Sequence, residues 1–140
     1  MPLSKILVDS SFLVALYDQD SDAYPEVREI AKLYRGQFLV PQVALTEVLY
    51  LLKRETGVQG AIAFLKEFNQ SQPDLQHVTV GDLKRVQEIM QQYASAKLDF
   101  VDCCVMALSE RLNITLVCTL DQRDFSIFRP KHCDYLEILP

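Results

Sequence analysis

The segment that most constrains the fold is an apolar run near the start of the chain that ends at a carboxylate. Residues 6–8 are Ile, Leu and Val, a continuous run typical of a strand buried on both faces of a parallel sheet. Asp9 ends the run, Ser10 and Ser11 are good helix-capping residues, and residues 12–16 read as a buried helix. A carboxylate is therefore expected at the carboxyl end of the first strand, where open α/β sheets place their ligands. A role as a simple helix cap is the alternative for Asp9.

Apolar runs of this kind alternate with segments of helical periodicity along the whole chain. Further strands are expected at residues 38–40, 78–80, 114–120 and 135–139. Helices are expected at about 22–34, with Ser21 or Asp22 as its cap, and at about 43–53, 58–68, 82–96 and 100–112. This alternation predicts one α/β domain over residues 1–140, with a mostly parallel five-stranded sheet and helices on both faces.

The composition excludes several classes of protein. Apolar residues make up 49% of the 140 residues, so the chain is not disordered. No apolar run has the length of a membrane span and the first residues lack a signal-peptide pattern, so we expect a cytoplasmic protein that does not bind a membrane. The four cysteines form no metal-binding motif and are expected to be free thiols. A net charge of −5 argues against a broad basic nucleic-acid surface, although a bound divalent cation can itself attract phosphate.

Glu47 is surrounded by apolar residues on the expected helix. Its neighbours three and four residues away on the expected helix are Val43, Ala44, Tyr50 and Leu51. A buried charge needs a partner or a metal ion, so this position favours a functional role for Glu47. An ion pair with Lys53 or Arg54, or a place at the exposed edge of the apolar stripe, is the alternative.

Asp102 also has apolar neighbours, Leu98, Val105 and Met106, but its sequence context has a second explanation. Asp99 is expected to cap the helix over residues 100–112, and Asp102 then falls at the third helical position, where a carboxylate suits the helix dipole. We therefore interpret Asp99 as structural, and Asp102 stays open between a structural and a functional role.

Asp121 follows the expected strand over residues 114–120, so it is the second acid at a strand end. Asp124 is three residues further on, and turn chemistry alone could account for both. Thr119 could orient a ligand or simply fill a strand position. If the strands before Asp9 and Asp121 are neighbours, their carboxylates converge.

Several carboxylates in one site repel each other unless a cation binds. Oxygen ligands of this kind favour Mg²⁺ or Mn²⁺, and such a site suits the hydrolysis of a phosphodiester. No Ser/His/Asp set, glycine-rich phosphate loop or Cys/His pair in the sequence competes with this interpretation.

Four motifs in this order resemble the PIN-domain family, and more closely the toxin nucleases of VapBC-type toxin–antitoxin modules. The motifs are Ile6-Leu7-Val8-Asp9-Ser10-Ser11, then Pro41-Gln42-Val43-Ala44-Leu45-Thr46-Glu47-Val48, then Leu98-Asp99-Phe100-Val101-Asp102, and last Thr119-Leu120-Asp121-Gln122-Arg123-Asp124-Phe125. The similarity covers nearly the whole chain. It departs from the family pattern at Cys103, where alanine is common, and at Ser10, where threonine is common.

The resemblance implies a metal-dependent endoribonuclease that cleaves RNA as the toxin of a type II toxin–antitoxin module. It implies one or two Mg²⁺ or Mn²⁺ ions held by the acids Asp9, Glu47, Asp102 and Asp121. It further implies supporting roles for Ser10, Thr119 and Asp124. A cognate antitoxin and a second copy of the chain are the protein partners that it implies. The candidates for contact with RNA phosphates are Lys53, Arg54, Lys97, Arg123 and Arg129.

The alternatives belong to other classes. A PIN-fold scaffold that binds RNA or a protein without cutting is the first, and metal-dependent cleavage discriminates it. A phosphatase of the haloacid dehalogenase type needs a second aspartate where this chain has Ser11. A response-regulator receiver needs a lysine after a late strand, where this chain has Asp121. Both of these fit the sequence poorly.

Overall fold

The structure, a computed structural model, describes residues 4–140 and is built around a parallel sheet. Its strands are β1 (Ile6–Val8), β2 (Phe38–Pro41), β3 (Asp74–Gln76), β4 (Leu116–Cys118) and β5 (Glu137–Leu139). They lie in the order β3-β2-β1-β4-β5, and every pairing is parallel. The expected five-stranded parallel sheet is therefore confirmed.

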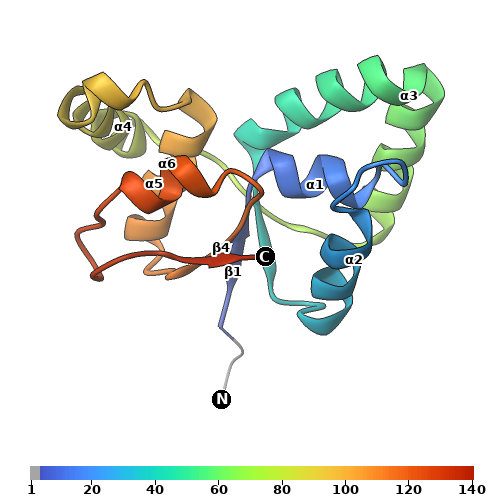
Figure 1. The fold of residues 1–140 in the computed structure, drawn as a ribbon, viewed down its shortest axis with the longest axis horizontal. Helices are drawn as coiled ribbons and strands as arrows, with labels where there is room; N and C mark the ends of the chain where they lie inside the picture. The colour runs from blue at the N-terminus through green and yellow to red at the C-terminus, as the bar shows by residue number, and fades with distance from the viewer. Residues whose placement is uncertain (1–3) are drawn as a thin grey trace.

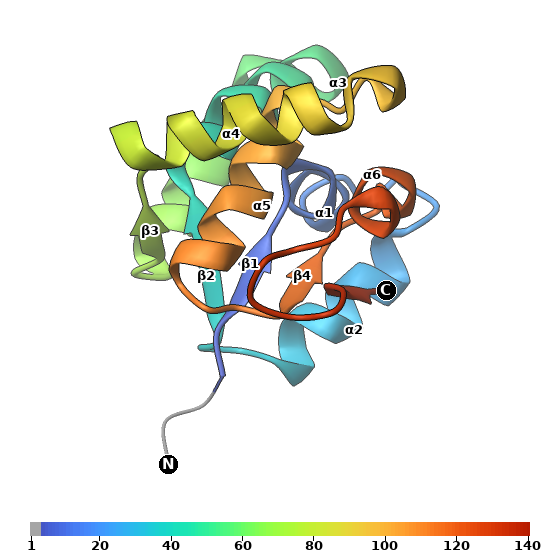
Figure 2. The same ribbon diagram turned by 90° about the vertical axis from the view of Figure 1, so that its left-hand side faces the viewer.

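Helices cover both faces of the sheet, as expected. They are α1 (Ser10–Leu16), α2 (Tyr24–Leu33), α3 (Gln42–Gln70), α4 (Val80–Gln92), the 3₁₀ turn η1 (Ala94–Ala96), α5 (Phe100–Arg111) and α6 (Gln122–Ile127). Figure 1 shows α1, α2 and α3 on one side of the sheet and α4, α5 and α6 on the other. Figure 2 looks onto the side that α4 and α5 cover.

Alternating side chains of the strands divide the interior into two cores. In β1, Leu7 packs into the core under α4, α5 and α6, whereas Ile6 and Val8 pack into the core under α1, α2 and α3. In β2, Leu39 and Val40 divide in the same way. The period of two residues explains why the short strands are continuous apolar runs, since neither face meets water.

The strand order determines where a site can form. From β1 the chain proceeds to β2 and β3 on one side, and it later returns to β4 and β5 on the other side of β1. The connections after β1 and β4 therefore lead to opposite faces of the sheet. The carboxyl ends of two such neighbouring strands are the usual place for a ligand in an open α/β sheet.

The third strand lies at Asp74–Gln76, so the expectation of a strand at residues 78–80 was wrong. Thr79 instead caps α4: its hydroxyl accepts a hydrogen bond from the Asp82 amide, and the Asp82 carboxylate accepts one from the Thr79 amide. This reciprocal capping box uses the polar groups that a strand would need for pairing. The edge strand β3 itself has few apolar residues and gave no apolar signal.

The two helices expected at residues 43–53 and 58–68 are confirmed as the two halves of α3, with the helical backbone broken at Gly57, where φ is 78° and ψ is 178°. Such a conformation is open almost only to glycine. Helix α2 begins at Tyr24 after Ala23, so neither Ser21 nor Asp22 is its cap. Strands β4 and β5 are shorter than the runs that predicted them.

A cavity of about 830 Å³ lies between α1, α2 and the second half of α3. Aromatic side chains, including Phe12, Tyr17 and Phe64, form part of its wall. Among residues 4–140, no helix has both the length and the apolar character that a membrane crossing requires.

Ion pairs join α4 to α5 on the side away from the bent helix. The Arg111 guanidinium donates to the Asp82 carboxylate at 2.9 Å, and Arg85 donates to Glu110 at 2.7 Å. Burial alone would raise the pKa of Asp82, but the hydrogen bonds from Arg111 and Thr79 outweigh it and lower that pKa. The folded state therefore stabilises the ionised form of Asp82.

We predict that Asp82→Asn lowers the free energy of unfolding at pH 7 by about 1–3 kcal/mol, because it removes the charged acceptor of Arg111. Since the pKa of Asp82 is lowered on folding, its contribution is complete above about pH 4 and is lost as the pH falls further. Urea unfolding at pH 7 and pH 3 measures the difference between wild type and variant, which should shrink at pH 3.

Glu88→Gln is the matched control, because Glu88 is exposed and pairs with Arg85 and Lys131 only at 3.5 and 3.7 Å. It should cost less than about 0.5 kcal/mol. Equal losses in the two variants would show that the buried position of Asp82 has no special effect.

Candidate metal-dependent nuclease site

Asp9 lies between the end of β1 and the start of α1, with an exposed fraction of 1%. Its Oδ1 accepts hydrogen bonds from the Ser10 amide at 2.6 Å and the Ser10 hydroxyl at 3.2 Å. Its Oδ2 accepts from the Ser11 hydroxyl at 3.1 Å and the Thr119 hydroxyl at 2.7 Å. The buried carboxylate is therefore fixed from two directions, by its own helix and by the end of β4.

Glu47 reaches the same region from α3. The Ser10 hydroxyl lies 2.8 Å from Glu47 Oε1 and 3.2 Å from Asp9 Oδ1, so this one side chain links the two acids. Glu47 is half-buried and forms no ion pair among residues 4–140, which removes the alternative of a salt bridge to Lys53 or Arg54. The helix begins directly after β2, and this placement points Glu47 toward the first strand.

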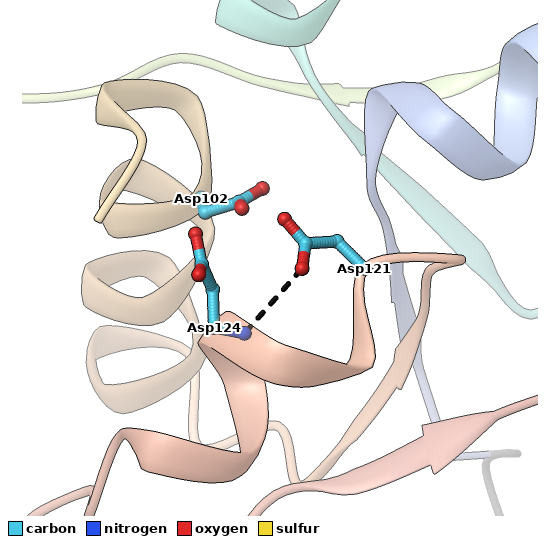
Figure 3. Close-up of side chains that lie close together, drawn as sticks. All are labelled: Asp102, Asp121 and Asp124. Atoms are coloured by element: carbon cyan, nitrogen blue, oxygen red, sulfur yellow. Dashed lines mark hydrogen bonds between the residues drawn. The ribbon is translucent and has the colours of Figure 1, made fainter. Parts of the chain in front are cut away.

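Three aspartates from two helices form the acidic centre of the site. Asp102 lies on α5, Asp121 lies at the cap of α6, and Asp124 lies in its first turn. Each offers a carboxylate oxygen that is within 4.8 Å of the oxygens of the other two. Figure 3 shows the three side chains pointing toward one another, with a hydrogen bond of 3.4 Å from the Asp124 amide to Asp121 Oδ1.

This arrangement is electrostatically unfavourable for Asp102. Burial raises the pKa of its carboxyl well above the ordinary range, and the charges of Asp9 and Asp121 and hydrogen bonding with Asp121 and Asp124 raise it further. The contribution of Asp9 indicates that its carboxylate lies near Asp102. A bound cation would relieve the repulsion among these carboxylates.

The expectation that the strands before Asp9 and Asp121 are neighbours is confirmed, because β1 pairs with β4. Thr119 connects their acids: its hydroxyl donates to Asp9 and accepts a hydrogen bond from the Asp121 amide at 2.9 Å. Asp9 and Glu47 are not among the three clustered aspartates and meet at the Ser10 hydroxyl instead, so their expected roles as metal ligands stay predictions. Asp124, expected only as a supporting residue, is one of the three.

Asp9 and Asp121 each combine two roles, since a residue can cap a helix and also belong to the site. Asp9 caps α1 and Asp121 caps α6, while both also face the acidic centre. Asp99 caps α5, as expected, by accepting hydrogen bonds from the amides of Val101 and Asp102.

Ser11 is a positioning residue that the sequence interpretation did not assign. Its hydroxyl donates to Asp9 and accepts a hydrogen bond from the Leu120 amide at 2.9 Å, so it connects the helix after β1 to the chain after β4. In the sequence, Ser11 is the second hydroxyl residue after Asp9, a position that indicates only a helix-capping residue.

Comparison with known families decides the classification. The family model described as PIN domain matches residues 6–129, which is most of the chain. This chain belongs to the PIN domain family. The match includes all the acids described above, from Asp9 in the first strand connection to Asp124 in α6.

The sequence identity between this PIN domain and individual relatives is low. It is 24% identical over 125 residues to Ribonuclease VapC26 of Mycobacterium tuberculosis, a match that covers 89% of this chain and 93% of the relative. The fold resembles that of VapC20 from the same organism, described as a Sarcin-Ricin loop cleaving toxin, with a TM-score of 0.83, 20% identity and coverage of 97% and 100%. It also resembles a chain of DNA-bound VapBC from Salmonella typhimurium, with a TM-score of 0.73, 13% identity and coverage of 98% for both chains.

We predict that Asp102→Asn raises the free energy of unfolding by about 1 kcal/mol at pH 7 in the presence of a chelator. The neutral amide removes the cost of burying a carboxylate beside other acids. Chemical unfolding of the two proteins measures the change. Asp99→Asn is the matched control, since asparagine caps a helix as well as aspartate does, and it should leave stability nearly unchanged. A loss of stability in Asp102→Asn would mean that the acidic centre is not strained.

Proposed function

We propose that this PIN domain is a divalent-cation-dependent endoribonuclease, the toxin of a type II toxin–antitoxin module. The observation that carries the proposal is the convergence of Asp102, Asp121 and Asp124 beside the buried Asp9. The match to a relative named as a ribonuclease supports the reaction type and the choice of RNA as substrate.

The donor set fits Mg²⁺ or Mn²⁺. It consists of carboxylate oxygens, which these hard cations prefer over the nitrogen and sulfur ligands that zinc takes. The cluster is compact, since each of the three carboxylates offers an oxygen within 4.8 Å of those of the other two. Asp102 and Asp121 are the residues that we assign to hold the ion, with Asp9 beside them.

A bound ion of this kind stabilises negative charge on a phosphate and makes a bound water more acidic. The chain itself supplies orientation. Ser10, Ser11 and Thr119 hold the Asp9 carboxylate in one position, and Ser10 also holds Glu47 through Oε1. Glu47 Oε2 accepts no hydrogen bond within residues 4–140, and we assign it to take a proton from the attacking water.

RNA binding requires positive charge near this acidic centre. Two of the basic candidates are committed elsewhere: Arg54 pairs with Glu55, and Arg129 donates to the carbonyl oxygens of Ser126 and Phe128. Lys53 and Lys97 are exposed and form no ion pair among the described residues. We propose that these two lysines contact the phosphates of the substrate.

The remaining partners follow from the family. We propose an antitoxin protein as the partner that blocks the acidic centre, a homodimer as the assembled form, and the cytoplasm as the location. The structural likeness to a chain of a VapBC complex supports the first of these. We also propose that residues 1–140 form one domain, which the pairing of the last strand β5 with β4 supports.

We predict that purified protein cuts a mixed set of structured and single-stranded RNAs with Mn²⁺ or Mg²⁺ and not with a chelator. Asp9→Asn/Asp102→Asn should reduce cutting at least about a hundredfold, because it removes charges that stabilise the transition state through the ion. Asp20→Asn, in the exposed turn between α1 and α2, is the matched control and should cut normally. Wild type that binds RNA but never cuts it would favour the scaffold alternative.

We predict that Mn²⁺ raises the melting temperature of wild type by about 3 °C or more at saturation, because the ion binds only the folded state. The Asp9→Asn/Asp102→Asn variant should show no such rise. Thermal melts with and without Mn²⁺ measure the two shifts. Equal shifts in both proteins would place the bound ion outside the acidic centre.

A further inference from the structure

Arg123 lies on α6, between Asp121 and Asp124 in the sequence. Its guanidinium group donates hydrogen bonds to other groups of the protein. Nη1 donates to Asp124 Oδ1 at 2.8 Å, and Nη2 donates to the carbonyl oxygen of Ala96 at 2.9 Å. The first contact holds an acid of the site. The second joins α6 to the 3₁₀ turn η1, which leads through Asp99 into α5. One side chain therefore connects the two helices that carry the acidic centre.

The hydrogen bonds of Asp124 distinguish it from the other two aspartates. Its Oδ1 accepts from Arg123, and its Oδ2 accepts from the Asp99 amide at 3.4 Å, so both oxygens already have protein donors. The Asp102 carboxylate, in contrast, accepts no hydrogen bond from a nitrogen or hydroxyl donor within residues 4–140. Asp121 has a donor only on Oδ1. Asp102 and Asp121 thus keep oxygens that accept from no N–H or hydroxyl donor, so a cation there would displace only the hydrogen bonding among the three carboxyl groups.

We propose that Arg123 is a positioning residue that occupies the carboxylate of Asp124 and so leaves Asp102 and Asp121 as the direct ligands of the cation. The inference rests on the proposed function, since it concerns the cation of that same site. It replaces the expectation from the sequence that Arg123 contacts RNA. Asp124 acts as a counter-charge that fixes Arg123, and the two together fix α6 against the start of α5.

The positive charge of Arg123 determines whether removing this side chain strengthens or weakens cation binding. Arg123 places a positive charge beside the cation site and occupies one oxygen of Asp124. Its removal frees a third carboxylate to bind the ion, so the ion should bind more tightly. A cation with more carboxylate ligands is a weaker Lewis acid, and the site loses its connection to η1. Turnover should therefore fall although the ion is held better.

The test compares Arg123→Ala and Arg123→Lys with Arg129→Ala as the matched control. Arg129→Ala also removes one positive charge near α6, but from a side chain that donates only to carbonyl oxygens. Calorimetric titration of the RNA-free proteins with Mn²⁺ gives the dissociation constant. We expect a value about threefold lower for Arg123→Ala than for wild type, and values close to wild type for Arg123→Lys and Arg129→Ala.

Cleavage kinetics at saturating Mn²⁺ provide the second measurement. Arg123→Ala should lower kcat and leave the KM for RNA nearly unchanged, and Arg123→Lys should restore part of kcat because it keeps the charge beside Asp124. A raised KM with unchanged kcat and unchanged Mn²⁺ affinity would show that Arg123 contacts RNA, which overturns the inference. Weaker Mn²⁺ binding in Arg123→Ala would also overturn it.

A thermal melt in chelator shows whether each variant folds. If Arg123→Ala does not fold, Arg123→Gln decides the question, because it removes the charge and keeps an amide donor; it should also bind Mn²⁺ more tightly than wild type. Wild type that binds no Mn²⁺ and cuts no RNA would refute the proposed function itself and the inference with it. Failure confined to the Arg123 variants refutes only the inference.

Discussion

The hydrogen bond between the Thr119 hydroxyl and Asp9 joins the two strands on which the site depends. This bond of 2.7 Å connects the end of β4 to the acid at the end of β1. The same hydroxyl accepts a hydrogen bond from the Asp121 amide. The parallel pairing of β1 with β4 brings these chain segments together, but pairing alone does not orient side chains. The hydroxyl groups of Thr119 and Ser11 provide the orientation, so the positions of Asp9 and Asp121 depend on both strand connections at once.

Aspartates serve two purposes in this fold. A carboxylate at a helix start stabilises the helix by accepting hydrogen bonds from its free amides, and three helices within residues 4–140 begin with such an acid. When two of those helices start at the same edge of a sheet, their caps also gather negative charge in one place. The cost of that charge is visible in the raised pKa of Asp102. The same residues thus stabilise the helix starts and concentrate negative charge at one edge of the sheet.

Patterns in the sequence predicted the parts of the fold that depend on near neighbours along the chain. The apolar runs located β1, β2, β4 and β5, and the isolated charge in an apolar stripe located Glu47. The prediction failed at β3 because an edge strand needs no apolar run, and because the Val78–Val80 run belongs to a helix start.

The missing parts of the site depend on contacts between distant segments. The bond from the Leu120 amide to Ser11 spans 109 residues, and the bond from Arg123 to Ala96 spans 27. No spacing rule along one helix or strand predicts such pairs. Arg123 looked like a free cation in the sequence because its two acceptors are known only once α6 lies beside the start of α5.

The bend at Gly57 divides α3 into two segments that contact different parts of the protein. The segment before it carries Glu47 toward the site, and the segment after it packs Phe64 and Phe68 against the opposite end of the sheet, along the 830 Å³ cavity. Because the helical backbone is interrupted at one glycine, the direction of the first segment is independent of that of the second. Small shifts of the second segment around the cavity therefore leave Glu47 in place at the other end of the helix.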